Sequence, residues 1–195
     1  MQRWLDEEYP SIQKKAKAEG AEIYCWDETG MRGDCQHGRG YAPRGKTPVI
    51  NLSAKRSATS MISAITNQGK VRFQIYDGRM NAQQLIQFLK RLIKDAKRKV
   101  MLILDNLRVH HANRVKVWLA KHADEIEVFY LPAYSPELNP DEYLNCDLKV
   151  GVHSKKPART RKELKAKVLS HMCMLQKRPD RVKKYLQHAK ISYAA

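Results

Sequence analysis

The sequence predicts an α/β fold in which helices flank a mixed, partly antiparallel sheet. The run VMLIL at 100–104 is continuously apolar, which is typical of a strand buried on both faces. Two strand-like segments joined by Asn67-Gln68-Gly69 predict an antiparallel hairpin. Helical and strand-like patterns alternate after that hairpin. The 195 residues suit a single domain with a sizeable core.

The first third of the chain is predicted to form a helix followed by strands. Residues 10–20 are basic, begin with a proline and end with a glycine, as short helices do. Residues 23–26 form a strand that we expect to end at Asp27. Residues 31–47 are too rich in glycine for regular structure and predict a basic loop. Further strands are expected at 49–52, 57–66 and 71–76.

The helices of the second half follow from apolar residues at three- and four-residue steps. The first has Asn81 available as its N-cap. A later one has Pro140 at its start and Glu142 in its first turn, where the helix dipole favours an anion. We expect helices at 81–96, 112–123, 141–150, 160–175 and 178–189, and a strand at 126–130.

Composition points to a polyanionic partner. The chain has 37 Lys and Arg against 20 Asp and Glu, a net charge of +17, so nucleic acid is the first candidate. It has no apolar run long enough for a membrane helix and no visible secretory signal, so we expect a soluble, cytoplasmic protein. The four cysteines form no CxxC pair, which argues against a zinc ribbon and a disulfide framework.

Acidic residues follow two of the predicted strands. Asp27 follows 23–26 and Asp105 follows 100–104. In open α/β sheets, ligands and metals collect at the carboxyl ends of strands, so both carboxylates are placed for chemistry. For an isolated aspartate after a strand, turn formation is the simpler interpretation. The recurrence of the pattern favours a site.

Three segments together resemble the catalytic motifs of DDE transposases of the mariner-like bacterial insertion-sequence group. They are WDETG, LILDN and FYLPAYSPELNPDEYLNCDLK, and the resemblance covers residues 21–150. The second and third acids, Asp105 and Glu142, are 142 − 105 = 37 positions apart, close to the spacing in that group. The resemblance implies a ribonuclease H-like catalytic core with a five-stranded mixed sheet.

The resemblance also implies the chemistry. Asp27, Asp105 and Glu142 would be the catalytic residues and the ligands of two Mg²⁺ or Mn²⁺ ions, since two-metal sites activate the nucleophile and stabilise the leaving oxygen. The family hydrolyses DNA at the ends of its element and joins the freed 3′-hydroxyl to target DNA. Double-stranded DNA is thus the expected partner, and a homodimer the expected active form.

Neighbouring residues have competing interpretations. Glu28 and Asp141 lie off the faces that carry the three acids, so we leave them out of the site. Asn145, where many family members have tryptophan, is expected to affect packing more than chemistry. His110 and His111 are interpreted as a polar cap of the next helix, although metal ligation or base catalysis remains possible. Trp26 and Tyr134 are candidates for base stacking, with packing preferred.

Two supporting residues and a set of cations complete the predicted site. Asn106 either orients Asp105, contacts a phosphate or forms a turn, and Asn139 belongs to the third motif. The cations of the glycine-rich loop and of the segment after residue 154 are interpreted as DNA-binding, against the alternative of solvated surface. They are Arg32, Arg39, Arg44, Lys46, Lys155, Lys156, Arg159, Arg161, Lys162 and Lys165.

We expect three parts in the chain. They are a leader helix at 1–20, left from a linker to missing helix-turn-helix modules, a catalytic core at 21–152, and a basic helical extension at 153–195 that packs on the core. Two alternatives to an active transposase remain open. One is a decayed or domesticated relative that only binds nucleic acid, and the other is a ribonuclease H-like nuclease.

Overall fold

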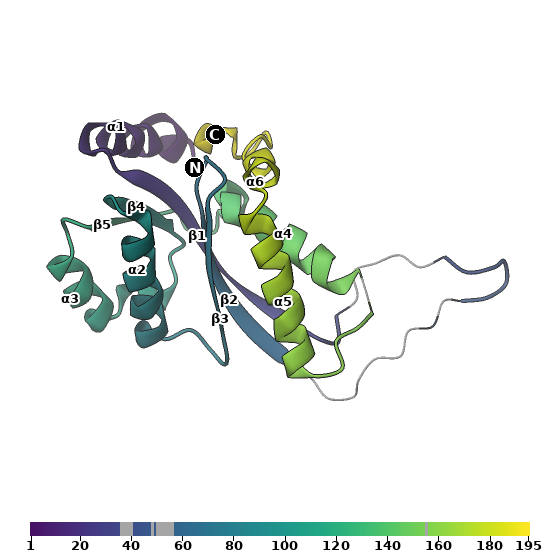
Figure 1. Ribbon diagram of the computed structural model, residues 1–195. Helices are drawn as coiled ribbons and strands as arrows, with labels where there is room; N and C mark the ends of the chain where they lie inside the picture. Colours follow the sequence, from purple (N-terminus) through teal and green to yellow (C-terminus); the bar gives the residue numbers. More distant parts are fainter. Residues whose placement is uncertain (36–40, 48, 50–56, 155) are drawn as a thin grey trace.

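The computed structural model describes residues 1–35, 41–47, 49, 57–154 and 156–195. Five strands form one mixed sheet in the order β3-β2-β1-β4-β5, and helices cover both of its faces (Figure 1). This confirms the predicted fold class. The strands are β1 Glu22–Arg32, β2 Ala58–Ile65, β3 Val71–Tyr76, β4 Val100–Leu104 and β5 Ile126–Tyr130.

The helices lie close to their predicted positions. Asn81 caps α2 through a reciprocal capping box with Gln84, as its place in the sequence indicated. Gly20 ends α1 with a φ of 60°, a left-handed conformation that glycine adopts without strain. The helices are α1 Tyr9–Glu19, α2 Ala82–Ala96, α3 Asn113–Lys121, α4 Pro140–His153, α5 Arg161–Gln176 and α6 Pro179–Tyr185, with a π-helical turn η1 at Trp4–Glu8 and 3₁₀ turns η2 Arg108–His111, η3 Pro136–Leu138 and η4 Ser192–Ala194.

The prediction that β1 ends at Asp27 is wrong. β1 pairs with β4 in parallel only up to Cys25↔Ile103, but its antiparallel pairing with β2 continues from Cys25 to Arg32. The partner strand, distant in sequence, therefore satisfies the main chain beyond Asp27. The first two residues of the predicted basic loop consequently belong to β1. Of the strand predicted at 49–52, residues 50–52 lie outside the described residues, and Val49 lies in no strand.

The register of β1 and β4 brings their acids to the same level of the sheet. The last parallel pair is Cys25↔Ile103, and Asp27 and Asp105 each lie two residues further along, since 27 − 25 = 105 − 103 = 2. The chain leaves the sheet after β4, whereas β1 continues along β2. Asp27 thus lies within a strand but still beside the carboxyl end of the parallel pair.

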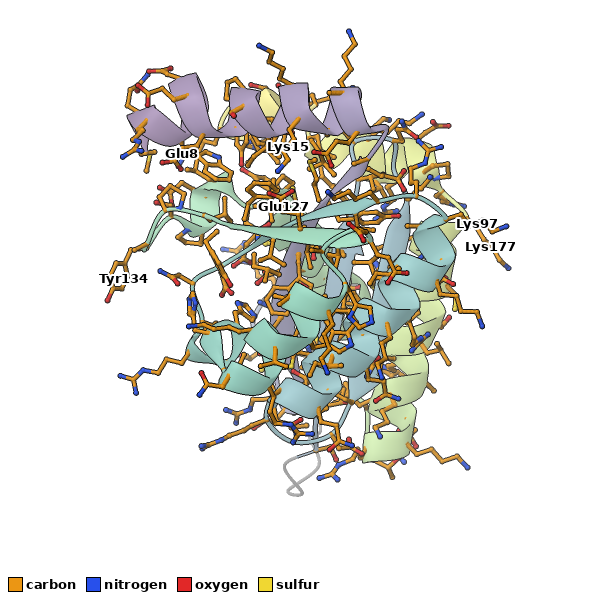
Figure 2. All side chains as sticks on the ribbon, turned by 90° about the vertical axis from the view of Figure 1, so that its left-hand side faces the viewer. Glu8, Lys15, Lys97, Glu127, Tyr134 and Lys177 are labelled. Carbon is orange, nitrogen blue, oxygen red and sulfur yellow. The ribbon has the colours of Figure 1, made fainter. Side chains whose placement is uncertain are left out.

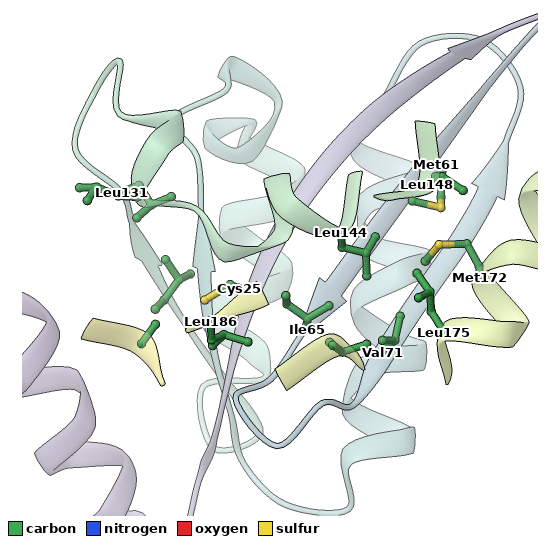
Figure 3. Close-up of a cluster of buried hydrophobic side chains, with 14 of the residues drawn as sticks. Cys25, Met61, Ile65, Val71, Leu131, Leu144, Leu148, Met172, Leu175 and Leu186 are labelled. Carbon is green, nitrogen blue, oxygen red and sulfur yellow. The ribbon is translucent and has the colours of Figure 1, made fainter. Parts of the chain in front are cut away.

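Apolar side chains form a cluster on each face of the sheet. On one face, α2 and α3 cover Tyr24, Trp26 and the side chains around them. On the other, α1, α4, α5 and α6 pack over Cys25, Met61 and Ile65 (Figure 3). Full burial of a side chain as large as Met61 or Ile65 stabilises the fold by about 1.5–3 kcal/mol.

The C-terminal segment shares the second of these clusters. Leu164, Met172 and Leu175 on α5 and Val182 on α6 are fully buried in it. Its end also reaches the beginning of the chain, where the ring of Tyr193 lies edge-on to that of Tyr9 with a centroid distance of 4.7 Å. Residues after 153 therefore form part of the layer that covers this face. None of the described helices is both long and apolar enough to cross a bilayer.

Candidate active site

The three predicted acids lie around one cavity. Its volume is about 390 Å³, and Asp27, Asp105 and Glu142 line it together with Asn106 and Asn139. Asp27 comes from the middle of β1, Asp105 from the residue after β4, and Glu142 from the first turn of α4. The fold thus brings to one place acids that are up to 115 positions apart in the sequence, since 142 − 27 = 115.

Asp27 is held at both carboxylate oxygens. Oδ1 accepts a hydrogen bond of 2.8 Å from the main-chain N–H of Glu28, and Oδ2 accepts one of 2.7 Å from Nδ2 of Asn145. The residue is only 7% exposed. Burial, and then repulsion by Glu142, raise the pKa of Asp27 to about 7. Asp27 therefore titrates near neutral pH, as metal ligands and acid–base groups at active sites often do.

Asp105 is supported by His110. Nδ1 of His110 lies 2.9 Å from the main-chain oxygen of Asp105 and 3.3 Å from its Oδ1. The histidine is fully buried, edge-on to Trp26 at a centroid distance of 4.6 Å. Burial lowers the pKa of His110 and raises that of Asp105. The prediction that His110 caps the next helix is therefore wrong. Its ring instead contacts Asp105 and fixes the turn that presents this acid.

Glu142 is positioned through Asn139. The Asn139 side chain accepts a hydrogen bond of 3.1 Å from the N–H of Asp141, which caps α4, and donates one of 2.9 Å to the main-chain oxygen of Trp26. Asn139 is buried. It therefore connects the helix that carries Glu142 to the strand that carries Asp27.

Asp141, which we left out of the site, lies beside Asp27. It is fully buried and accepts a hydrogen bond of 2.8 Å from the hydroxyl of Ser63 on β2. Burial, followed by repulsion from Asp27, raises its pKa well above the usual range. The sequence did contain a signal for this burial, because Asp141, Leu144 and Leu148 follow the helical spacing of one face.

Asn145, which we expected to affect packing more than chemistry, contacts one of the three acids. Asn145 is 1% exposed, and its amide contacts the carboxylate of Asp27 directly. It lies three residues after Glu142, on the same helix. The amide therefore orients one of the three acids from the helix that carries another.

Replacing Asn145 with Leu, which has a similar size, is expected to weaken metal binding by Asp27, the role predicted for this acid from the sequence. Loss of a hydrogen bond that orients a ligand typically reduces metal affinity or activity about 10- to 100-fold. We therefore expect a 10- to 100-fold higher Mn²⁺ concentration for half-maximal nicking of plasmid DNA by Asn145→Leu. Cys146→Ala, which changes an exposed side chain next to it, is the control. An unchanged metal requirement in Asn145→Leu would show that the hydrogen bond has no role in metal binding.

The other residues considered for the site differ in burial and in the side chains that they contact. Trp26 is fully buried, which confirms the packing interpretation. Tyr134 is 101% exposed, so packing does not explain it. Nε2 of His111 lies 2.5 Å from Oδ1 of Asn106, and the His111 ring lies against Tyr130 at a centroid distance of 4.7 Å. These contacts hold Asn106 at the edge of the cavity.

The predicted DNA-binding cations that the structure describes lie on the surface, and two of them are paired. Arg32 forms hydrogen bonds of 2.6 and 2.9 Å with Asp34, and Lys165 forms an ion pair of 2.6 Å with Asp77. Arg39 and Lys155 lie outside the described residues. The other predicted cations are exposed, namely Arg44, Lys46, Lys156, Arg159, Arg161 and Lys162.

The side chains around the cavity suit a hard divalent cation. All three acids offer carboxylate oxygens, and Oδ1 of Asp105 is buried without a hydrogen-bond donor among the described residues. Mg²⁺ and Mn²⁺ prefer such ligands. In the described parts of the chain, no three acidic, histidine or cysteine side chains are close enough to hold an ion jointly. Repulsion between the carboxylates, which contributes to the raised pKa of Asp27, favours this separation.

The mixed five-stranded sheet in the order β3-β2-β1-β4-β5, with Asp27 in the middle of β1 and Asp105 just after β4, is consistent with a ribonuclease H-like fold. Residues 22–165 match the family described as DDE superfamily endonuclease. The chain belongs to this family. No curated protein matches the sequence significantly.

Solved structures of Mos1 share the fold. The catalytic domain of Mos1 mariner transposase aligns with a TM-score of 0.60 at 15% identity, covering 100% of this chain and 95% of that one. The mariner Mos1 paired-end complex with Mg aligns with a TM-score of 0.66 at 16% identity, covering 98% and 61%. The Mos1 strand transfer complex aligns with a TM-score of 0.63 at 19% identity, covering 98% and 59%. The chain thus spans about three fifths of the Mos1 chains in these complexes.

Proposed function

We propose that this chain is the catalytic domain of a DNA transposase that cleaves phosphodiester bonds at the ends of its element and joins them to target DNA. The observation that carries this proposal is the meeting of Asp27, Asp105 and Glu142 at one cavity. Family membership and the fold shared with Mos1 transposase support it. We further propose that residues 21–152 form the core and that 153–195 extend it.

Asp27, Asp105 and Glu142 are the proposed ligands of two Mg²⁺ or Mn²⁺ ions. Mos1 structures with Mg and with Mn support this choice of metal. Metal ions held by these carboxylates would supply activation of the nucleophile near neutral pH and charge stabilisation for the attacking and leaving oxygens. Asp27 must lose its proton to act as a ligand, and its pKa of about 7 places this step near neutral pH. Asn145, His110 and Asn139 keep the ligand-bearing segments in position.

The proposed function is tested by incubating the purified chain with supercoiled plasmid and Mg²⁺ or Mn²⁺. Nicked circles that form only with the metal support it. A second assay with a labelled oligonucleotide ending in a free 3′-hydroxyl tests for joining to the plasmid. Joining distinguishes a transposase from a nuclease on the same fold. The absence of both nicking and joining at all metal concentrations would contradict the proposal.

DNA is the proposed partner, and a homodimer the proposed active form. The net charge of +17 supports binding of a polyanion. The fold shared with Mos1 transposase, which is solved in a paired-end complex with the left transposon end, supports DNA as the partner.

DNA binding by this chain is expected to depend steeply on salt and weakly on sequence, because phosphate contacts position a protein whereas base contacts specify. Arg159→Ala/Arg161→Ala/Lys162→Ala/Lys165→Ala is expected to reduce the slope of log affinity against log salt by about 0.9 for each lost phosphate contact. Lys165 is paired with Asp77, so we expect a reduction of about three units from the other three residues. A titration of random duplex at several salt concentrations measures the slope. Lys90→Ala/Lys94→Ala/Lys116→Ala, on α2 and α3, is the control. An equal slope in wild type and the first variant would exclude this segment from DNA contact.

A further inference from the structure

We infer that Tyr134 stacks on an unpaired nucleobase next to the phosphate that is cleaved. The inference rests on the proposed function, since it assumes that DNA occupies the cavity around Asp27, Asp105 and Glu142. Tyr134 lines that same cavity, in the segment between β5 and α4. The following observations distinguish it from an ordinary surface tyrosine.

The side chain of Tyr134 lacks packing contacts. It is 101% exposed, and Figure 2 shows it directed away from the body of the protein. No hydrogen bond or ring contact involves it within the described chain. Single exposed hydrophobic residues are common, so exposure alone indicates no function. Here the exposed residue is one of those that line the cavity around the three acids, so its ring projects into solvent at the edge of that cavity.

The main chain of Tyr134 is in a conformation that tyrosine disfavours. Its φ is 55°, and the other described non-glycine residue with positive φ is Lys97, which ends α2 as a left-handed C-cap. A bulky residue in this region costs of order 1 kcal/mol, and such strain clusters at functional sites. Glycine or asparagine would fit this position better. Stability therefore does not explain the tyrosine.

The segments on either side keep Tyr134 in place. The N–H of Leu131 donates a hydrogen bond of 2.8 Å to the main-chain oxygen of Leu104, next to Asp105. The hydroxyl of Ser135 donates one of 3.3 Å to the oxygen of Ala133, and Pro136 restricts the chain after it. Leu131 and Ser135, on either side of Tyr134, are both buried. The ring is thus presented from a fixed main chain beside the acids.

The wall near Tyr134 suits a base rather than a phosphate. Pro132 and Pro136, two residues before and after Tyr134, contribute apolar groups to the cavity lining, whereas the acids contribute carboxylates. The volume of about 390 Å³ lies in the range of about 300–1,000 Å³ typical of ligand cavities. A nucleotide with its phosphate at the acids would have its base within reach of the ring. Stacking of this kind does not depend on base identity, because every base has a π-face.

The test compares binding of two DNA duplexes in Ca²⁺, one fully paired and one with three unpaired nucleotides at a 3′ end. We expect the wild type to prefer the frayed duplex. Tyr134→Phe keeps the ring and should keep the preference, whereas Tyr134→Leu should reduce binding of the frayed duplex about 5- to 150-fold. Tyr41→Leu is the control, because Tyr41 is 99% exposed but does not line the cavity.

Two further measurements separate stacking from an effect on folding. Replacing the last unpaired base by 2-aminopurine should give fluorescence that is quenched on binding to wild type and Tyr134→Phe but not to Tyr134→Leu. Tyr134→Asn should melt at the same or a higher temperature than wild type, because asparagine tolerates positive φ. A lower melting temperature would indicate a structural role and overturn the inference.

The outcomes also distinguish this inference from the proposed function. If Tyr134→Leu keeps the preference and the quenching while the acid variants lose nicking, the stacking inference is wrong and the proposed function stands. If wild type shows no preference for the frayed duplex, the stacking inference is likewise wrong. If the chain neither binds nor nicks any DNA, both are wrong.

Discussion

Changing Asp27→Asn, Asp105→Asn or Glu142→Gln is expected to reduce metal-dependent nicking by about a thousandfold. Each change removes the charge of one proposed ligand but keeps its shape. Metal ions contribute several kcal/mol to stabilisation of charge in the transition state, and each 1.36 kcal/mol corresponds to a factor of ten in rate. Initial rates of plasmid nicking at saturating Mn²⁺ measure the effect.

The control for these variants is Asp180→Asn. Its carboxylate is 90% exposed and lies on α6, 3.4 Å from Lys183. The same chemical change there should leave the rate unchanged. If one of the three acid variants retains the wild-type rate, that residue does not belong to the site.

Asp147→Asn is expected to destabilise the fold by about 2–4 kcal/mol, because hydrogen bonds to charged groups contribute about 1.5–3 kcal/mol each. Asp147 on α4 accepts two hydrogen bonds of 2.7 Å from Arg181, one of 3.1 Å from His171, and one from Tyr185. Its side chain is only 11% exposed. It thus connects α4 to both C-terminal helices. Denaturant unfolding at pH 7 measures the difference, and Asp180→Asn is again the control.

The effect of Asp147→Asn should depend on pH in a defined direction. Burial acts to raise the pKa of Asp147, but hydrogen bonds from His171, Arg181 and Tyr185 outweigh it and hold that pKa well below the usual range. A group with a lowered pKa contributes stability above its unfolded pKa, and this contribution is lost as the pH falls through the folded value. The wild type should therefore exceed the variant in stability at pH 7 and approach it below about pH 3. A difference that does not change with pH would contradict the role of the charge.

Local patterns predicted most of the fold. The apolar run of β4 and the asparagine before α2 lead directly to a buried strand and a capped helix. The length of β1 could not be predicted in this way, because its second half is held by β2, whose paired residues lie from 58 − 32 = 26 to 63 − 27 = 36 positions away in the sequence. The β-propensity of a segment describes that segment by itself, whereas the residue at which a strand ends depends on the strands that pair with it.

The acids of the site could be found from the sequence, but their surroundings could not. Asp27, Asp105 and Glu142 stand in motifs that are recognisable without a structure. The contact between Asn145 and Asp27 spans 118 positions and requires α4 to cross β1 at one register. Asp141 was left out of the site because it lies off the helical face that carries Glu142, although its spacing with Leu144 and Leu148 placed it on the buried face. The exposure of Tyr134 and its positive φ could not be predicted from the sequence, because both are properties of the folded chain.

We propose that the three acids form one divalent metal site, and the change in melting temperature on adding Mn²⁺ measures this binding without any DNA substrate. Binding to the native state stabilises it by about 2.7 kcal/mol at a hundredfold excess over the Kd, which for a chain of this size corresponds to a rise of about 5–10 °C. The pKa of Asp27 is raised to about 7, so the proton competes with the metal below that pH. We expect a large rise in melting temperature at pH 8, a smaller one at pH 6, and none in Asp27→Asn, Asp105→Asn or Glu142→Gln. An equal rise in wild type and all three variants, or no rise at pH 8 in the wild type, would contradict it.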